Sequence, residues 1–102
     1  MAQVMAYELT VALKPDLPAA SAKKIIEDIE HAAKEVGGAV EKVESVGIKP
    51  LSYPIRGLGQ ASFSRFMLRL SPDQASIFQN DLARRDDLLR VLMVKGGGGK
   101  NG

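Results

Sequence analysis

Few side chains in this sequence could carry out a reaction. The chain has no cysteine and a single histidine, His31, so neither a thiol nucleophile nor a histidine-rich metal site is predicted. The hydroxyl groups considered as nucleophiles are Ser52, Ser62 and Ser64, and none has a recognisable base beside it. His31 lies among charged residues and is interpreted as a surface side chain. The sequence therefore predicts no catalytic site, no metal ion and no cofactor.

Neither of two loop types that bind phosphate is complete in this sequence. An acyl-phosphate hydrolase would need a glycine loop with an arginine after the first strand, whereas residues 14–18 read Lys-Pro-Asp-Leu-Pro. The glycine run at 96–99 has no helix after it, so a phosphate-cradling loop is not indicated. Residues 96–102 are instead interpreted as a flexible glycine-rich tail. An enzyme is not predicted.

The residues with the clearest chemical potential are cations that can contact phosphate groups. Residues 1–44 carry five lysines and eight acidic residues, whereas residues 45–102 carry nine lysines and arginines and four aspartates. The second region contains every arginine, and no acidic residue occurs between Ser45 and Pro72. The planar guanidinium group of arginine matches phosphate geometry well. This distribution favours a polyanionic partner on one side of the molecule; the alternative is a solvated face without a partner.

A stretch stiffened by proline, Val46–Arg56, contains the first of these cations. Its two prolines, Pro50 and Pro54, exclude a helix and push the residues before them, Lys49 and Tyr53, toward extended conformations. Proline inside a sheet is confined to edge strands. We therefore predict an extended, basic arm that forms an edge strand or continues beyond one.

The elements that must position this arm follow from hydrophobic periodicity. Alternation predicts a strand over 7–13, and a 3.6-residue period predicts a helix over 19–36. A strand over 40–48 is predicted to contain a bulge at Gly47. After a turn at 57–59, the remaining elements are a strand over 61–70, a helix that begins with a Ser71–Gln74 capping box and ends near 84–85, and a strand over 88–95.

This order of elements predicts an α+β, ferredoxin-like βαββαβ fold, with a four-stranded antiparallel sheet and two helices on one face. A single domain is expected over residues 1–95, since 102 residues suffice for one domain. One strand residue, Phe63, is out of phase with its apolar neighbours, so it either packs on the far face or follows a bulge. Without a secretory signal or an apolar run near the roughly 20 residues that cross a bilayer, a soluble intracellular protein is expected.

The same fold can bind single-stranded RNA by stacking bases on aromatic side chains, as the RNA recognition motif does. Residues 56–59 read Arg-Gly-Leu-Gly, a superficial match to that family's third-strand signature. However, the stacking positions fall on Leu58 and Gln60, and neither is aromatic. Base stacking is therefore not predicted for this strand.

Several segments together resemble small-subunit ribosomal protein number six of bacteria and organelles. Residues 47–55 are similar to that family's Gly-x-basic-x-Leu-Ala-Tyr-Pro-Ile signature, and Tyr7 with Glu8 resembles its opening Tyr-Glu. The resemblance extends to about Lys95, and the other matching segments are 40–44, 85–86 and 90–95. The sequence departs from the family pattern at Pro50, Ser52 and Phe63, where a basic or polar residue, an alanine and a tyrosine are common.

The resemblance implies a structural protein of the small ribosomal subunit that acts without catalysis, in the cytoplasm or in an organelle. It also implies two partners, small-subunit ribosomal protein number eighteen and the small-subunit (16S-type) ribosomal RNA. No membrane and no small-molecule substrate are expected. The alternative, from another class, is a ferredoxin-like regulatory or ligand-binding domain that self-associates.

The resemblance and the charges together predict a set of site residues. Lys49, Arg90 and Lys95 match basic positions of the family and Tyr53 matches its tyrosine, while three arginines are added on charge alone. The predicted phosphate contacts are Lys49, Arg56, Arg65, Arg69, Arg90 and Lys95. The predicted protein-partner contacts are Leu51, Tyr53 and Ile55, because apolar side chains on an exposed arm need a cover. The alternatives are ordinary solvated cations and a Tyr53 ring that packs on its own sheet edge.

Overall fold

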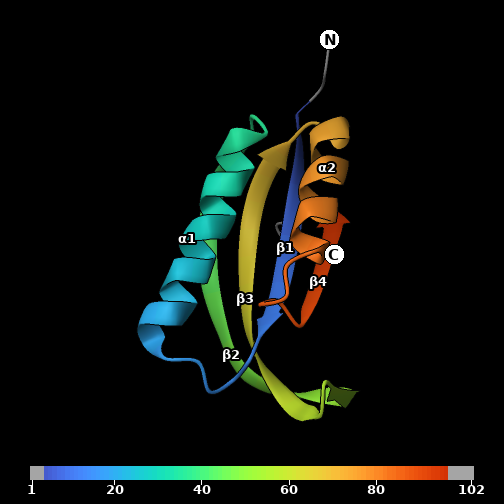
Figure 1. Ribbon diagram of the computed structural model, residues 1–102. Coiled ribbons are helices and arrows are strands. Elements are labelled where there is room, and N and C mark those ends of the chain that lie inside the picture. The colour runs from blue at the N-terminus through green and yellow to red at the C-terminus, as the bar shows by residue number, and fades with distance from the viewer. Residues whose placement is uncertain (1–3, 97–102) are drawn as a thin grey trace.

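The computed structural model describes residues 4–96 and consists of two helices packed on one face of a four-stranded antiparallel sheet (Figure 1). The strands lie in the spatial order β2-β3-β1-β4, so β2 and β4 form the two edges. This is the predicted ferredoxin-like arrangement. The predicted glycine tail lies, apart from Gly96, outside the described residues. The elements are β1 (Met5–Leu13), α1 (Ala19–Glu35), β2 (Ala39–Ile55), β3 (Leu58–Leu70), α2 (Pro72–Ala83) and β4 (Arg90–Lys95).

The hydrophobic core lies between the sheet and the two helices. Alternate residues of β1 and β3 face the helices, and α1 buries one stripe of Ile25, Ile29 and Ala33, as its 3.6-residue period predicted. Removing this apolar surface from water is the main stabilising contribution to the fold. The largest fully buried side chains are Phe66, Phe78, Leu9, Leu13, Ile29, Leu68, Leu70, Leu82 and Val11.

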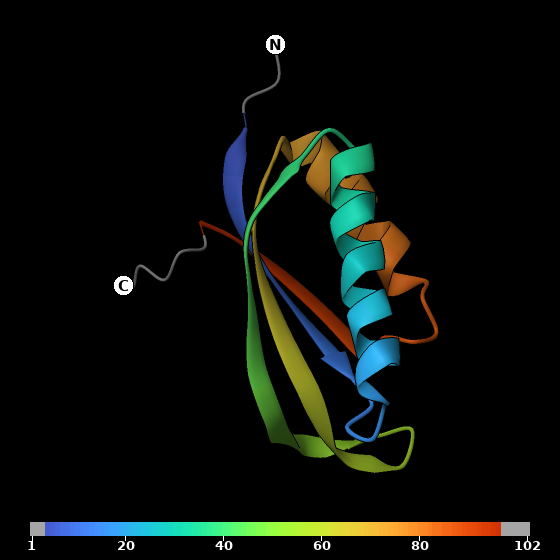
Figure 2. The same ribbon diagram turned by 90° about the vertical axis from the view of Figure 1, so that its left-hand side faces the viewer.

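The opposite face of the sheet, called the open face here, has no helix over it in the described part of the chain (Figure 2). The β1–β3 pairing keeps one register from Met5–Leu70 to Leu13–Ser62. Phe63 therefore needs no bulge to explain its phase. It pairs with Ala12 and lies on the open face, which is the first of the two alternatives that the sequence allowed.

The predicted arm is the second half of one long edge strand. β2 joins the strand predicted at 40–48 to the arm, and its pairing with β3 is irregular at three places. One of these is the predicted bulge at Gly47, where φ is 102°. The turn predicted at 57–59 was placed too late: residues 56 and 57 form it, and β3 begins at Leu58.

The helices begin and end close to their predicted positions. The capping box at the start of α2 is present, because Ser71 Oγ accepts a hydrogen bond from the Gln74 amide at 3.3 Å and Gln74 Oε1 accepts one from the Ser71 amide at 3.2 Å. Within residues 4–96, neither helix has the length and apolar character needed to cross a bilayer.

Candidate nucleic-acid interface

The sheet register brings most of the predicted phosphate contacts to the open face. Residues paired across antiparallel strands point to the same side of a sheet. On β1, the alternate residues 6, 10 and 12 face the open side, and their partners are Arg69, Arg65 and Arg90. Lys49 of β2 pairs with Ala61, which is in phase with Arg65 along β3. Four cations from three strands therefore share one face.

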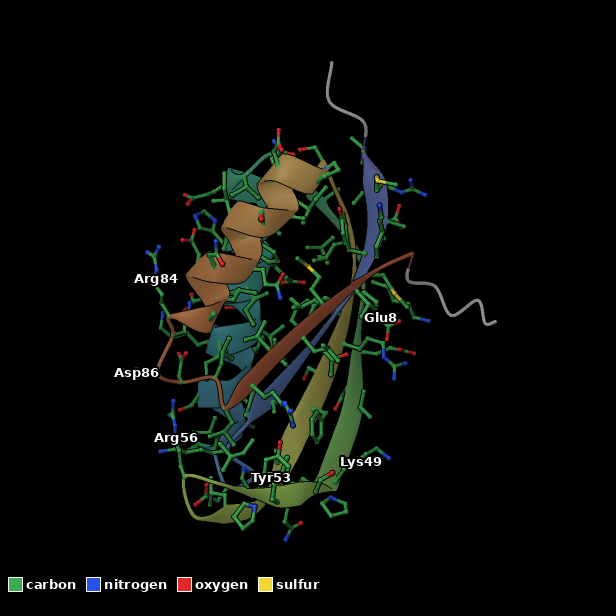
Figure 3. The ribbon with its side chains drawn as sticks, turned by 90° about the vertical axis from the view of Figure 1, so that its right-hand side faces the viewer. Glu8, Lys49, Tyr53, Arg56, Arg84 and Asp86 are labelled. Atoms are coloured by element: carbon green, nitrogen blue, oxygen red, sulfur yellow. The ribbon has the colours of Figure 1, made fainter. Side chains whose placement is uncertain are left out.

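Two of these four cations are already bound to carboxylates. Arg65 Nε lies 2.8 Å from Glu8 Oε2 without alignment for a hydrogen bond, and its Nη1 donates to Glu44 Oε1 at 3.3 Å. Arg69 Nε donates to Glu41 Oε2 at 2.7 Å. Glu8 lies on the side of the sheet away from the helices (Figure 3). The acidic partners come from β1 and the first half of β2. The stretch from 45 to 72 has no acidic residue in the sequence, but in the fold its arginines on β3 lie next to carboxylates of neighbouring strands.

The other two cations on this face have no such partner. Lys49 and Arg90 are exposed, and neither makes an ion pair or a side-chain hydrogen bond within residues 4–96. Lys95 is also exposed and unpaired in that range, but it pairs across strands with Tyr7, a residue of the helix-facing side. It is therefore separated from Arg90, although both belong to β4.

The sixth predicted contact, Arg56, lies at the turn between β2 and β3 on the helix side of the molecule (Figure 3). Its Nη1 donates to the backbone carbonyl of Asp86 at 2.7 Å. Asp86 belongs to the loop between α2 and β4. The arginine therefore joins two segments that lie 30 residues apart in the chain.

The three predicted partner contacts differ in exposure. Tyr53 has 66% of its surface exposed, so its ring is not packed on the sheet edge as the alternative required. Leu51 and Ile55 are half-buried. Two further apolar residues on the open face, Leu92 and Val94 of the edge strand β4, are also exposed and were not assigned from the sequence.

Another group of charged residues, which was not predicted from the sequence, lies at the start of the α2–β4 loop. Arg85 Nη2 lies 2.7 Å from Asp87 Oδ2 and 3.2 Å from Asp28 Oδ2 of α1. The hydrogen bond from Arg85 lowers the pKa of the Asp87 carboxyl below its usual value, and the same bond raises the pKa of Arg85. A run of Arg-Arg-Asp-Asp gave no sign of this, because Asp28 is brought in by the fold.

Comparison with known proteins decides the family. Residues 6–95 match the family described as Ribosomal protein S6. The chain belongs to this family. The small ribosomal subunit protein bS6 of Thermus thermophilus is 33% identical over 89 residues, which cover 87% of this chain and 88% of the relative. The protein of that name from Halalkalibacterium halodurans is 28% identical over 89 residues, covering 87% of this chain and 94% of its own length.

Solved structures agree on the fold. The 30S ribosomal protein S6 of Thermotoga maritima superposes with a TM-score of 0.82 and 18% identity, covering 91% of this chain and 88% of that protein. The P2 domain of the chemotaxis kinase CheA from the same organism, solved with the response regulator CheY, gives a TM-score of 0.60 at 15% identity, covering 91% and 99%. The second likeness reflects a shared ferredoxin-like architecture alone.

Membership in the S6 family settles the class of protein. The family is structural and non-enzymatic, so the prediction that this chain is not an enzyme is confirmed. The family's place is the small subunit of the ribosome, which in bacteria works in the cytoplasm. The predicted resemblance and the predicted ribosomal location are confirmed with it.

Proposed function

We propose that this member of the S6 family binds small-subunit ribosomal RNA together with small-subunit ribosomal protein number eighteen. The observation that carries the RNA part is the pair Lys49 and Arg90, two exposed cations on the open face without a carboxylate partner in the described chain. Such side chains can neutralise phosphates without first giving up an internal ion pair. Phosphate contacts of this kind position a protein on RNA and do not read its sequence.

The six predicted contacts are proposed to contribute unequally. Lys49 and Arg90 contribute most, and Lys95 adds a contact from the helix side. Arg65 and Arg69 contribute less, because each must leave a carboxylate at 2.8 or 2.7 Å before it can bind a phosphate. Arg56 donates to the Asp86 carbonyl and is not expected to add a phosphate contact.

The proposed protein-partner surface is the hairpin end, defined here as residues 50–59. It carries exposed Tyr53 with half-buried Leu51 and Ile55 beside it. Exposed aromatic residues next to apolar neighbours are typical anchors of protein interfaces. A protein partner that covers Tyr53 would remove this apolar surface from water.

A filter-binding titration with small-subunit ribosomal RNA and the partner protein, at several salt concentrations, tests the RNA contacts. A plot of log K against log salt has a negative slope, because binding releases counterions. Lys49→Ala and Arg90→Ala should each make this slope shallower by roughly 0.7–0.9, depending on whether the contacted RNA is single- or double-stranded. Lys23→Ala on the exposed side of α1 is the matched control and leaves the slope unchanged. Unchanged binding in both test variants would contradict the proposal.

The alternative function, a self-associating regulatory domain, predicts a different solution mass. Sedimentation of the protein, alone and mixed with RNA or the partner protein, separates the two functions. A tight homodimer that does not bind RNA supports the alternative. A monomer that forms a heterodimer with the partner protein supports the ribosomal function. The S6 family match favours the second outcome.

A further inference from the structure

We infer that Arg56 is a positioning residue, which fixes the hairpin end to the α2–β4 loop and does not contact RNA. The importance of this position for binding rests on the proposed function, since the hairpin end carries the proposed partner surface. The contact itself does not depend on that function. The positioning role is inferred from the strand pairing of the hairpin, the backbone conformation of Arg56 and the surroundings of its acceptor.

The sheet holds the hairpin end only weakly. The β2–β3 pairing stops at Pro50–Gln60 and resumes at Ile55–Leu58. Between these pairs, β2 has the four residues 51–54 and β3 has only Gly59. Most of the proposed partner surface therefore lies where cross-strand pairing is interrupted. Figure 2 shows this end bending toward the helix side of the sheet.

Arg56 supplies a tertiary contact at this point. Its φ is 52°, a left-handed conformation that is uncommon outside glycine, asparagine and aspartate. From this turn its guanidinium extends to the Asp86 carbonyl, and the Nη1–O distance is 2.7 Å (Figure 3). Among the side-chain hydrogen bonds of residues 4–96, it is the one that leaves the hairpin end. A charged donor makes such a bond stronger than a neutral one.

The acceptor belongs to a loop that is itself fixed on two sides. Next to Asp86, Arg85 binds Asp87 and reaches Asp28 of α1. On the other side, the Leu89 amide donates to the Ala12 carbonyl of β1 at 2.7 Å. Arg56 therefore ties the hairpin end to a loop anchored on both layers of the fold. Holding a binding segment in one conformation lowers the entropy lost when a partner binds.

Hydrogen exchange on the full chain tests the contact directly. Arg56→Asn tolerates the left-handed backbone but cannot reach the loop, and Arg56→Lys keeps the charge on a side chain that ends closer to the backbone than Nη1 does. Both variants are expected to raise amide exchange at the hairpin end roughly three- to tenfold, as loss of one exposed charged hydrogen bond would. Amides of the β1–β3 pairing stay unchanged. Arg84→Ala, which removes a neighbouring exposed arginine, is the control.

Binding then separates a positioning role from an RNA contact. The inference predicts a roughly three- to tenfold loss of affinity for protein number eighteen in both variants, with the RNA salt slope of the isolated protein unchanged. Exchange at the hairpin end that equals the wild type would overturn the inference. The inference would also be overturned if the salt slope becomes shallower in Arg56→Asn and returns to the wild-type value in Arg56→Lys. If the wild-type protein does not bind protein number eighteen, the proposed function fails, and the exchange result still decides the role of Arg56.

Discussion

On the open face, the central strand β3 and the edge strands β2 and β4 carry cations in opposite states. Arg65 and Arg69 of β3 are bound by Glu8, Glu44 and Glu41 from neighbouring strands. Lys49 of β2 and Arg90 of β4 are exposed, and neither makes an ion pair within residues 4–96. The first region stabilises the sheet internally, while the second presents its charges to solvent.

This difference shows that charge along a chain is not charge available to a partner. The stretch from 45 to 72 contains no acidic residue, yet β1 and the start of β2 place three glutamates beside β3. An arginine in a central strand has neighbours on both sides, so it is readily paired. A lysine on an edge strand has a neighbour on one side only.

The largest effect is expected from Arg65→Ala on stability. Removing this side chain leaves Glu8 and Glu44 on the same face without their shared cation, and Glu8 is only 22% exposed at its side chain. The free energy of unfolding should fall by about 1 kcal/mol, a value reduced from that of a buried ion pair because Arg65 and Glu44 are partly solvated. Urea denaturation followed by circular dichroism measures this change.

The matched variant for this comparison is Lys49→Ala in the other region. It should change the free energy of unfolding by less than about 0.5 kcal/mol, because an exposed residue without partners contributes little. If Lys49→Ala destabilises the protein as much as Arg65→Ala does, the distinction between the two regions is wrong.

The same distinction explains how far the sequence could be read. Local signals gave the order of the elements, the Gly47 bulge and the Ser71–Gln74 cap, because periodicity, glycine and capping side chains act over a few residues. The family resemblance predicted Lys49 and Arg90 as phosphate contacts, and both side chains are exposed. The partners of the arginines depend on strand register, which no local signal fixes. Asp28 and Arg85, which lie 57 residues apart, meet only through the packing of α1 against the α2–β4 loop.

A smaller effect is expected from Asp87→Asn, and it depends on pH. Arg85 lowers the pKa of Asp87 in the folded protein, so the ion pair stabilises the fold above the unfolded carboxyl pKa of about 3.9. That stabilisation is lost as the pH falls through the folded pKa. The variant should therefore be less stable than the wild type near pH 7, and the two should converge below about pH 4. Thermal unfolding at a series of pH values tests this, and a constant difference down to pH 2 would contradict it.

A small effect is also expected from Arg69→Ala. Its ion pair with Glu41 is about half exposed on both sides, so the variant should lose only about 0.2–1 kcal/mol of unfolding free energy. Its RNA salt slope should change less than that of Arg90→Ala, because a phosphate must compete with a carboxylate 2.7 Å away.

A separate variant, Glu41→Gln, sharpens the comparison, because it frees Arg69 from its carboxylate without removing the arginine. The single Glu41→Gln variant should then bind RNA more tightly and with a steeper salt slope than the wild type. Equal slopes for the Arg69→Ala and Arg90→Ala variants would mean that the carboxylates of the open face do not restrain its arginines.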